Sequence, residues 1–561
     1  MLQINPIAAA IRCAFLLTGL AASPWLLADD APQATPPSTP LSPVEVNAAA
    51  VGYAVAPNYQ KKTVTLGPLG QVKLLDTPYS VSVAPQDLIV NQQATDANEL
   101  LRYLPSTQLE QRSGAALGRP QSRGFEGEMV SNSRMDGLNF VDSTAIAAEE
   151  LEQISVLNGL AGALYGPQVP GGIFEYTRKS PTDTPLNRLV LGYGDDSVLT
   201  EHGDFGGRLG QGGWFGYRIN VLHADGDGPY KDSHLNRNLI SGNFDFHIDE
   251  HTLLQLDATR YRFSQRGWPG IFIYNSAGNT ELPSARSAEH TGYGQPYGGM
   301  DLNSKTQLAK LTHDFNDDWH LSIGFLHELA QRYLPVISNN FTGNAGNYLV
   351  TLGQNSISQF AVDSNMAYLN GKVETGSWEH ELTFGTNGYV ERRAFGHNPA
   401  SVNLGTGSYF DSSFLPEVPW GSDPGFQHQP IQTRNTQQTL IAGDTLHFTP
   451  QWAVMGIVSS SWLSSRNFAR SGAQTSDYEV RGAISPTASI IYTPTTRDTL
   501  YATYARSEQP GDTAPTNATN AGDTLAPYRS SQYELGYKTE LDGLSLGAAL
   551  FHMVRPFALV G

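Results

Sequence analysis

Residues 151–181 read LEQISVLNGLAGALYGPQVPGGIFEYTRKSP and separate two parts of the chain with different sequence patterns. The glycines and the proline of LYG-x-x-x-PGG indicate tight turns, which occur in many folds. The surroundings are more informative. Short segments with both helical and strand spacing precede this stretch, and only short alternating segments follow it. We therefore interpret it as the end of a compact N-terminal domain that leads directly into a long β-domain.

The composition is compatible with a membrane protein built from strands. The 561 residues include 10% aromatic residues and 56 glycines, and no long apolar run follows the N-terminal segment. A closed sheet can cross a membrane without such a run. The formal net charge of −18 argues against nucleic-acid binding, which needs a basic face. Cys13 is the only cysteine, so the rest of the chain forms no internal disulfide, thiolate metal site or cysteine nucleophile.

The first 28 residues have the pattern of a secretory signal peptide. Arg12 supplies the positive charge, Cys13–Ala22 the apolar segment, and small residues near 21–23 or at 28 the cleavage region. Residues 29–69 are predicted to be a linker, because its first part carries prolines at positions 32, 36, 37, 40 and 43. We expect export from the cytoplasm and an extended segment before the first domain.

Strand periodicity is clearest at residues 215–221 and 533–539. In each segment apolar residues, such as Tyr217 and Leu535, alternate with small or polar ones. This pattern suits lipid on one face and a polar lumen on the other, and it places Glu534 on the lumenal face.

Connections in the second half alternate between short and long. Short turns such as Leu209–Gly213 and Glu540–Gly543 alternate with long polar stretches such as Gln265–Ser304 and Arg393–Thr433. This alternation is typical of outer-membrane barrels, and it divides residues 183–561 into roughly 15 strands.

Four ordered pieces of residues 70–182 resemble the plug domain of TonB-dependent outer-membrane siderophore receptors. Residues 85–104 have helical spacing, and they are followed by Ser122-Arg123-Gly124-Phe125, Met135-Asp136-Gly137-Leu138 and residues 150–165. The resemblance implies an all-β transmembrane antiparallel barrel with an α+β plug in its lumen. Plugged transporters have about 22 strands, so residues 183–561 are expected to form a partial barrel. The ending RPFALVG lacks a terminal aromatic strand, and we expect a C-terminally truncated receptor.

The resemblance also implies a partner and a function. Val44, Glu45, Val46, Asn47 and Ala48 resemble the TonB box, which adds as a strand to the TonB energy-coupling protein. The expected function is TonB-dependent uptake of a ferric siderophore across the outer membrane, in contact with outer-membrane lipid, with iron as part of the substrate and no resident cofactor. A non-iron substrate such as a vitamin, sugar or metal complex, a non-functional truncated receptor, and a passive porin remain alternatives.

Ligand contacts are expected at the plug apices and outer loops. Among the apex residues we predict contacts from Arg112, Gly127, Glu128 and Phe140. Loop aromatics could stack on a chelate or pack within the loops; they are Trp268, Phe272, Tyr274, Tyr293, Tyr297, Phe410 and Trp420.

No motif indicates catalysis or a resident metal. The 14 histidines form no HExxH pair, and no serine lies in a Gly-x-Ser-x-Gly elbow. We therefore do not expect an enzyme.

The resemblance implies ion pairs between two plug arginines and two barrel glutamates. Arg123 and Glu534 match one member of each set. At the other plug position the chain has Asn158 and Leu160, and Arg506 occupies the other expected glutamate position. We predict an Arg123–Glu534 contact that Arg506 joins.

Overall fold

The computed structural model describes residues 59–556 except 112–116, 195, 229, 275–277, 279, 288–291, 397–400, 412–413, 419–428, 510, 512–518, 520–524 and 526. The predicted signal peptide and the Val44–Ala48 segment lie outside the described residues. No helix in the described part is long and apolar enough to cross a membrane.

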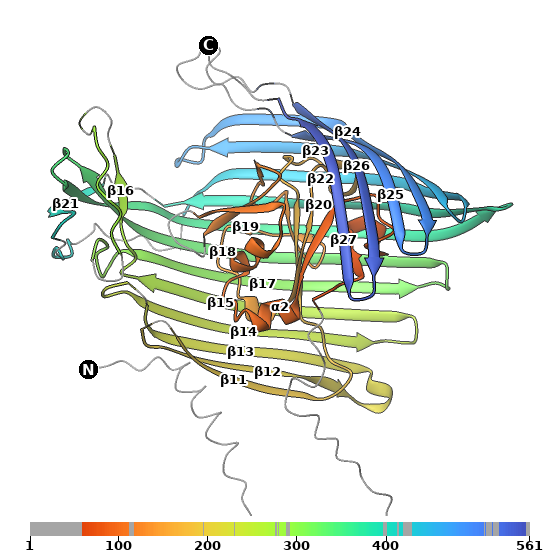
Figure 1. Cartoon of the computed structure of the whole chain (residues 1–561), viewed down its shortest axis with the longest axis horizontal. Coiled ribbons are helices and arrows are strands. Elements are labelled where there is room, and N and C mark those ends of the chain that lie inside the picture. The colour runs from red at the N-terminus through yellow and green to blue at the C-terminus, as the bar shows by residue number, and fades with distance from the viewer. Residues whose placement is uncertain are drawn as a thin grey trace, which may run out of the picture. The chain divides into compact units, whose positions relative to one another are not determined.

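Residues 63–178 form three small sheets and several short helices (Figure 1). The central sheet has the order β3-β9-β10-β7-β8 and is mixed, because β10 pairs with β7 in parallel and with β9 antiparallel. Its strands are β3 (Val81–Pro85), β9 (Leu151–Leu157), β10 (Ile173–Arg178), β7 (Ser133–Met135) and β8 (Leu138–Asn139). The other two sheets are β1 (Thr63–Thr65) with β2 (Gln71–Lys73), and β4 (Thr107–Gln111) with β5 (Gly118–Ser122) and β6 (Phe125–Glu126). The helices are η1 (Gly67–Leu69), α2 (Gln86–Asn91), η2 (Ala97–Tyr103), η3 (Ala148–Glu150) and α3 (Gly162–Tyr165).

Two local expectations differ from the structure. The helical spacing of residues 85–104 yields α2 and η2 rather than one helix, since Gln93 adopts φ +52° and Asp96 caps η2 by accepting from the Asn98 N–H at 2.8 Å. β1 begins within the predicted linker, because Val64 is only 2% exposed and belongs to the plug core.

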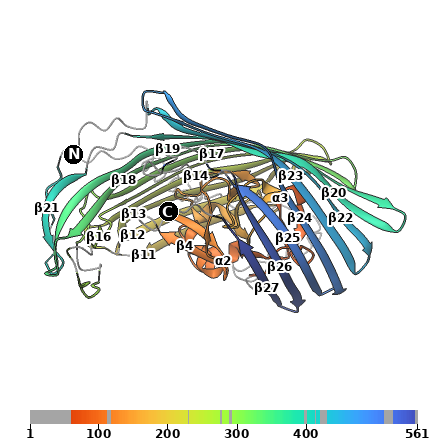
Figure 2. The same cartoon turned by 90° about the horizontal axis from the view of Figure 1, so that it is seen from above.

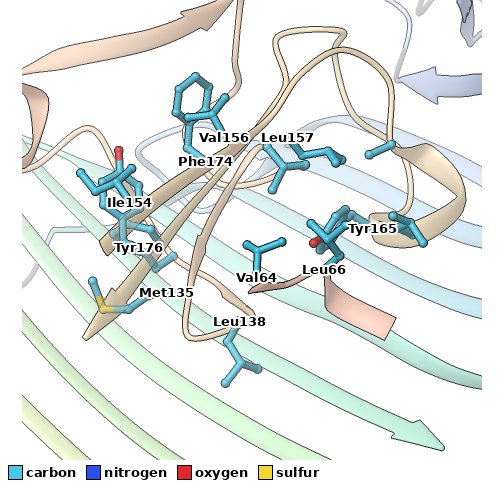
Figure 3. Close-up of a cluster of buried hydrophobic side chains, with 14 of the residues drawn as sticks. Val64, Leu66, Met135, Leu138, Ile154, Val156, Leu157, Tyr165, Phe174 and Tyr176 are labelled. Carbon is cyan, nitrogen blue, oxygen red and sulfur yellow. The ribbon is translucent and has the colours of Figure 1, made fainter. Parts of the chain in front are cut away.

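The plug core is formed by residues of the central sheet and of its flanking helices. Ile154 is opposite Tyr176 and Val156 is opposite Phe174 in the β9–β10 register (Figure 3). Tyr165 from α3 packs in the same cluster and approaches η1 so closely that a side chain at Gly67 would collide with its ring. The stretch 151–181 thus supplies two central strands and the helix that closes this core.

The second half forms a 17-stranded sheet, β11 to β27, in which each long strand pairs antiparallel with the next long strand in sequence, whereas β16 pairs in parallel with β18 and β21 pairs with β19. Two members, β16 (Ile271–Ile273) and β21 (Val402–Ser408), are short pieces of the long connections, and the remaining strands match the roughly 15 predicted. These are β11 (Leu186–Gly194), β12 (Val198–Leu209), β13 (Phe215–Asp227), β14 (His234–His247), β15 (Thr252–Arg266), β17 (Gly299–Asp314), β18 (Trp319–Phe341), β19 (Asn347–Thr375), β20 (Trp378–Phe395), β22 (Ile431–Thr449), β23 (Trp452–Phe468), β24 (Gln474–Thr495), β25 (Asp498–Gln509), β26 (Tyr528–Leu541) and β27 (Leu544–Val554). A one-turn helix, η4 (Gln211–Gly213), joins β12 and β13.

The large sheet curves around the plug elements (Figure 2). Side chains alternate as predicted: Tyr533 and Leu535 are exposed on the outer face of β26, whereas Gln532 and Glu534 are buried toward the plug. The predicted fold, an antiparallel transmembrane sheet around an α+β plug, is confirmed.

Candidate ligand cavity and plug anchorage

A two-residue turn carries Arg123 to the barrel wall. Ser122 pairs with Phe125 across the β5–β6 hairpin, and Arg123 and Gly124 both have positive φ, +55° and +81°. Arg123 Nη1 lies 2.5 Å from Glu534 Oε2, and the two side chains are 4% and 3% exposed. The structure therefore brings together a plug cation and a barrel anion that water barely reaches.

Two barrel side chains complete the surroundings of Glu534. The Tyr501 hydroxyl donates to its Oε1 at 2.6 Å, and Gln532 Nε2 donates to its Oε2 at 3.0 Å. We did not predict either contact. Gln532 shares the lumenal face of β26 with Glu534 by strand alternation, so periodicity could have found it; Tyr501 depends on the pairing of β25 with β26.

Arg506 does not join this contact, and that part of the prediction is wrong. Its Nη2 lies 3.0 Å from Glu508 Oε1, which Arg529 Nε also reaches at 3.0 Å. The reason is strand parity: Arg506 has the parity of Leu500, which is exposed, whereas Tyr501 is buried toward Glu534. A lumenal glutamate cannot be replaced by a residue of the opposite parity.

Neutral hydrogen bonds occupy the second anchoring position. Asn158 Oδ1 accepts from the hydroxyls of Ser106 at 2.6 Å and Ser122 at 2.7 Å, within the plug. The Leu160 N–H donates to Gln532 Oε1 on the barrel at 3.0 Å. The segment is thus tied to the barrel without a second arginine, and through the same Gln532 that contacts Glu534.

Three further ion pairs hold the plug to β12–β15. They are Lys179 with Asp204 at 2.9 Å, Arg178 with Asp257 at 3.0 Å, and Glu149 with Arg237 at 2.8 Å. Burial lowers the pKa of Lys179 from its ordinary value, and the neighbouring Asp204 opposes that shift. The sequence does not predict these pairs, because no local pattern relates residues 149 and 178–179 to particular barrel strands.

A cavity of about 300 Å³ lies between the plug and β20–β25. Its plug side includes Glu128, Gln168 and Val169, and its barrel side includes Arg393 and Gln509. Arg393 and Gln509 lie close to the strand ends that lead into long connections, so the cavity is at the end of the barrel with the long loops. Its other lining residues are Val130, Ser131, Pro167, Tyr389, Glu391, Asn435, Thr436, Gln437, Leu463, Ser464, Ser465, Tyr478, Gly511 and Arg555.

Of the four predicted ligand residues, the structure places one in the cavity lining. Glu128 is exposed and lines this cavity. Gly127 is buried beneath it, and its N–H donates to the Pro120 carbonyl at 3.1 Å. Phe140 does not reach a ligand site: it is 1% exposed and packs edge-on against Tyr176 with ring centroids 5.3 Å apart, because it points into the plug core. Arg112 lies outside the described residues.

Most of the described loop aromatics pack against one another. Tyr293 stacks on Tyr409 at 5.3 Å, and Phe272 meets the Tyr293 ring edge-on at 4.9 Å. These rings share a buried cluster with Tyr348. Trp268 meets Tyr230 edge-on, and Trp420 lies outside the described residues. The loop-packing alternative accounts for the aromatics of this cluster.

The described residues contain no group of three or more His, Cys, Asp or Glu side chains arranged to hold a metal ion. The buried charges named above are paired across the plug–barrel boundary or lie beside the cavity. The arrangement can hold a plug in place and bind a solute at the loop end.

Comparison with known proteins assigns both halves. Residues 73–173 match the TonB-dependent Receptor Plug Domain, and residues 241–555 match the TonB dependent receptor-like, beta-barrel family. The ferrichrome receptor FcuA of Yersinia enterocolitica is 23% identical over 525 residues, covering 88% of this chain and 66% of that protein. The ferric-pyoverdine 358 receptor of Pseudomonas putida is 22% identical over 544 residues, covering 92% and 64%. The chain therefore spans slightly less than two thirds of the length of these relatives.

Similarity to solved structures supports the fold. The crystal structure of BauA, the ferric preacinetobactin receptor from Acinetobacter baumannii, superposes with a TM-score of 0.74 and 24% identity, covering 88% of this chain and 73% of that one.

A further relative in sequence is the metal-pseudopaline receptor CntO of Pseudomonas aeruginosa, which is 25% identical over 443 residues, covering 74% of this chain and 58% of that protein.

Proposed function

Since the chain belongs to the family of TonB-dependent receptors, we propose that it takes up a ferric siderophore actively across the bacterial outer membrane. The observation that carries the proposal is a plug anchored inside the barrel sheet beneath a cavity of about 300 Å³ at the loop end. A chelate bound there contacts plug and barrel together, so its binding can shift the plug. Relatives named as receptors for ferrichrome and ferric pyoverdine support iron as the cargo.

The energy source in this proposal is the TonB protein of the inner membrane. Val44–Ala48 would pair with it as an added strand, and pulling on this segment would open a path beside the plug. Residues 1–28 would direct export, and outer-membrane lipid would surround the exposed face of the sheet. The chain would act as a transporter rather than an enzyme, without a resident cofactor and without nucleic acid as a partner.

A complex of another metal is the second candidate substrate. The similarity to a metal-pseudopaline receptor favours it over a vitamin or a sugar. A passive porin is disfavoured, because the plug fills the space that a porin leaves open to water.

Growth under iron starvation tests the proposal. A siderophore-receptor knockout that expresses this chain should grow on at least one ferric siderophore and accumulate radioactive iron, and both should stop when Val44–Ala48 is deleted or tonB is removed. Uptake that survives both deletions would indicate a passive pore. Accumulation of nickel, zinc or cobalt complexes without iron would favour the second candidate.

A further inference from the structure

We propose that the loop-end cavity selects a ferric chelate of about zero net charge with amide or hydroxamate groups on its surface, and discriminates against trianionic catecholate chelates. This inference rests on the proposed function and names the class of its substrate. Three features of the cavity support it: its charge balance, its hydrogen-bonding groups and its few aromatic rings.

The charges that line the cavity cancel. Glu391 accepts from Arg393 Nε at 2.6 Å and from Arg393 Nη2 at 3.0 Å, so this bidentate pair leaves no surplus charge. The other two charged lining residues are Glu128 and Arg555, one of each sign. A ligand with three negative charges needs a surplus of cations to replace its hydration, and the described lining offers none.

The lining is rich in neutral hydrogen-bonding groups. Gln168 is 2% exposed, and neither its amide oxygen nor its amide nitrogen has a hydrogen-bond partner in the described structure. On the barrel side, the amide oxygen of Gln509 is also buried and has no hydrogen-bond partner in the described structure. Buried amides without partners are costly, and a ligand or water that pairs with them recovers that cost.

The position of Gln168 is fixed by its backbone. Its N–H donates to the Glu508 carbonyl at 3.0 Å, and its own carbonyl accepts from the Ser507 hydroxyl at 3.1 Å. These bonds hold the Gln168 backbone at the boundary of plug and barrel, where the residue lines the cavity. An amide offers one donor and one acceptor group, which suit the carbonyl and N–H groups of amide and hydroxamate chelates.

Aromatic rings are few in the described lining. Tyr389 and Tyr478 are its aromatic residues, and the Tyr478 hydroxyl already accepts from the Gly511 N–H at 3.3 Å. The loop rings Tyr293 and Tyr409 stack on one another instead. The described lining thus offers few stacking surfaces that would favour catechol rings over polar groups.

Binding of two defined chelates tests the inference. Ferrichrome is a neutral hexadentate trihydroxamate, and ferric enterobactin is a trianionic tricatecholate; each is titrated into the full chain, purified in detergent, while tryptophan fluorescence is followed. We expect ferrichrome to bind at least about tenfold more tightly. Tighter binding of ferric enterobactin, or equal affinity for both, would overturn the inference while leaving siderophore uptake intact. If neither iron chelate binds, the inference is overturned, and growth on other ferric siderophores decides the proposed function separately.

Two variants locate the selectivity in this cavity. Gln168→Met removes the amide at similar length and should weaken ferrichrome binding about tenfold. The control is Gln71→Met, which alters an exposed glutamine on β2 away from the cavity lining and should leave affinity unchanged. Unchanged ferrichrome affinity in Gln168→Met, with normal folding by circular dichroism, would overturn the assignment of this cavity.

The second variant reverses one charge. Glu128→Lys leaves the lining with a net positive charge, and it should tighten ferric enterobactin binding about tenfold while changing ferrichrome affinity far less. Raising the salt concentration should shrink that gain. An equal change for both chelates would show that charge at this cavity does not set the selectivity, and would overturn the inference.

Discussion

Arg123 and Glu534 are 411 positions apart in the sequence, yet Arg123 Nη1 lies 2.5 Å from Glu534 Oε2 in a setting that leaves the two side chains 4% and 3% exposed. One belongs to a tight turn of the plug and the other to the lumenal face of β26. The Arg123 guanidinium also lies over the Phe551 ring, 4.1 Å from its centroid. Through these two contacts, the Arg123 side chain ties the plug to strands β26 and β27 of the barrel.

Removing the carboxylate should loosen the plug. Glu534→Ala leaves Arg123 buried without its anion, a change that costs about 3–5 kcal/mol in buried pairs. We expect cells that express this variant to admit vancomycin and erythromycin several-fold faster. Glu479→Ala, which removes an exposed partner of Arg481, is the control and should not alter permeability. Normal insertion with unchanged antibiotic entry in Glu534→Ala would count against an anchoring role.

The Tyr501 hydroxyl should contribute through the same carboxylate. Tyr501→Phe removes a hydrogen bond to a charged acceptor at 2.6 Å, worth about 1.5–3 kcal/mol. In a double-mutant cycle with Glu534→Gln, measured as the free energy of plug unfolding, the two losses should be less than additive. Additive losses would show that the two side chains act independently.

Strand alternation explains why one half of this contact was predictable. Period-two patterning places Glu534 on the lumenal face without any knowledge of pairing. The error at Arg506 has the same origin, since an alignment that slips by one residue exchanges the two faces of a strand. Tyr501 depends on the pairing of β25 with β26, which the local sequence does not specify.

Burial within the plug was harder to predict than the barrel pattern. Phe140 follows a turn motif, and its sequence neighbours do not distinguish an exposed apex from the core that packs it against Tyr176. The ion pairs of Lys179 and Arg178 with β12–β15 likewise join segments that only the tertiary fold brings together. The sequence thus predicts the architecture well and the contacts between its layers poorly.

Phe140 and Glu128 are both predicted to contact the ligand, but only Phe140 is buried in the plug core, so alanine substitutions should affect plug stability differently. Phe140→Ala should destabilise the plug by about 3–5 kcal/mol, because a buried aromatic side chain leaves a cavity. Glu128→Ala should leave plug stability within about 0.5 kcal/mol, because Glu128 is exposed. Urea unfolding followed by proteolysis of the plug measures both. Equal stability of the two variants would contradict the core position of Phe140.

Plug stability should depend on pH through Glu175. Burial raises the pKa of this carboxyl to about 8, although the Gly137 N–H donates to it at 2.8 Å. Glu175 lines a cavity of about 140 Å³, and Asp136, Asp257 and Lys310 are also among its lining residues. Between its ordinary pKa and about 8, the folded state binds more protons than the unfolded chain, so stability is full below the ordinary pKa and falls as pH rises through about 8.

The measurement is hydrogen exchange in β10 at pH 5.5 and pH 8, corrected for the intrinsic exchange rate. Glu175→Gln keeps an acceptor for the Gly137 N–H but cannot ionise, so β10 should lose less protection on going to pH 8 than in the native chain. Burial also raises the pKa of Glu150, Asp96 and Asp142 to about 7, and only the difference between the two proteins reports on Glu175. The same pH dependence in both would contradict this assignment.

Two lysines in ion pairs of different depth should respond differently to the same substitution. Lys179 lies 2.9 Å from Asp204 with side chains 5% and 1% exposed, whereas Lys61 lies 3.2 Å from Glu152 with side chains 32% and 36% exposed. Asp204 pairs with both Lys179 and Arg218. Lys179→Met removes the first of these cations and should destabilise the plug–barrel contact by about 3 kcal/mol. Lys61→Met breaks a solvated pair and should cost less than about 1 kcal/mol. The free energy of plug unfolding in urea measures both changes. If Lys179→Met costs no more than Lys61→Met, Arg218 alone neutralises Asp204, and the junction between plug and barrel does not depend on Lys179.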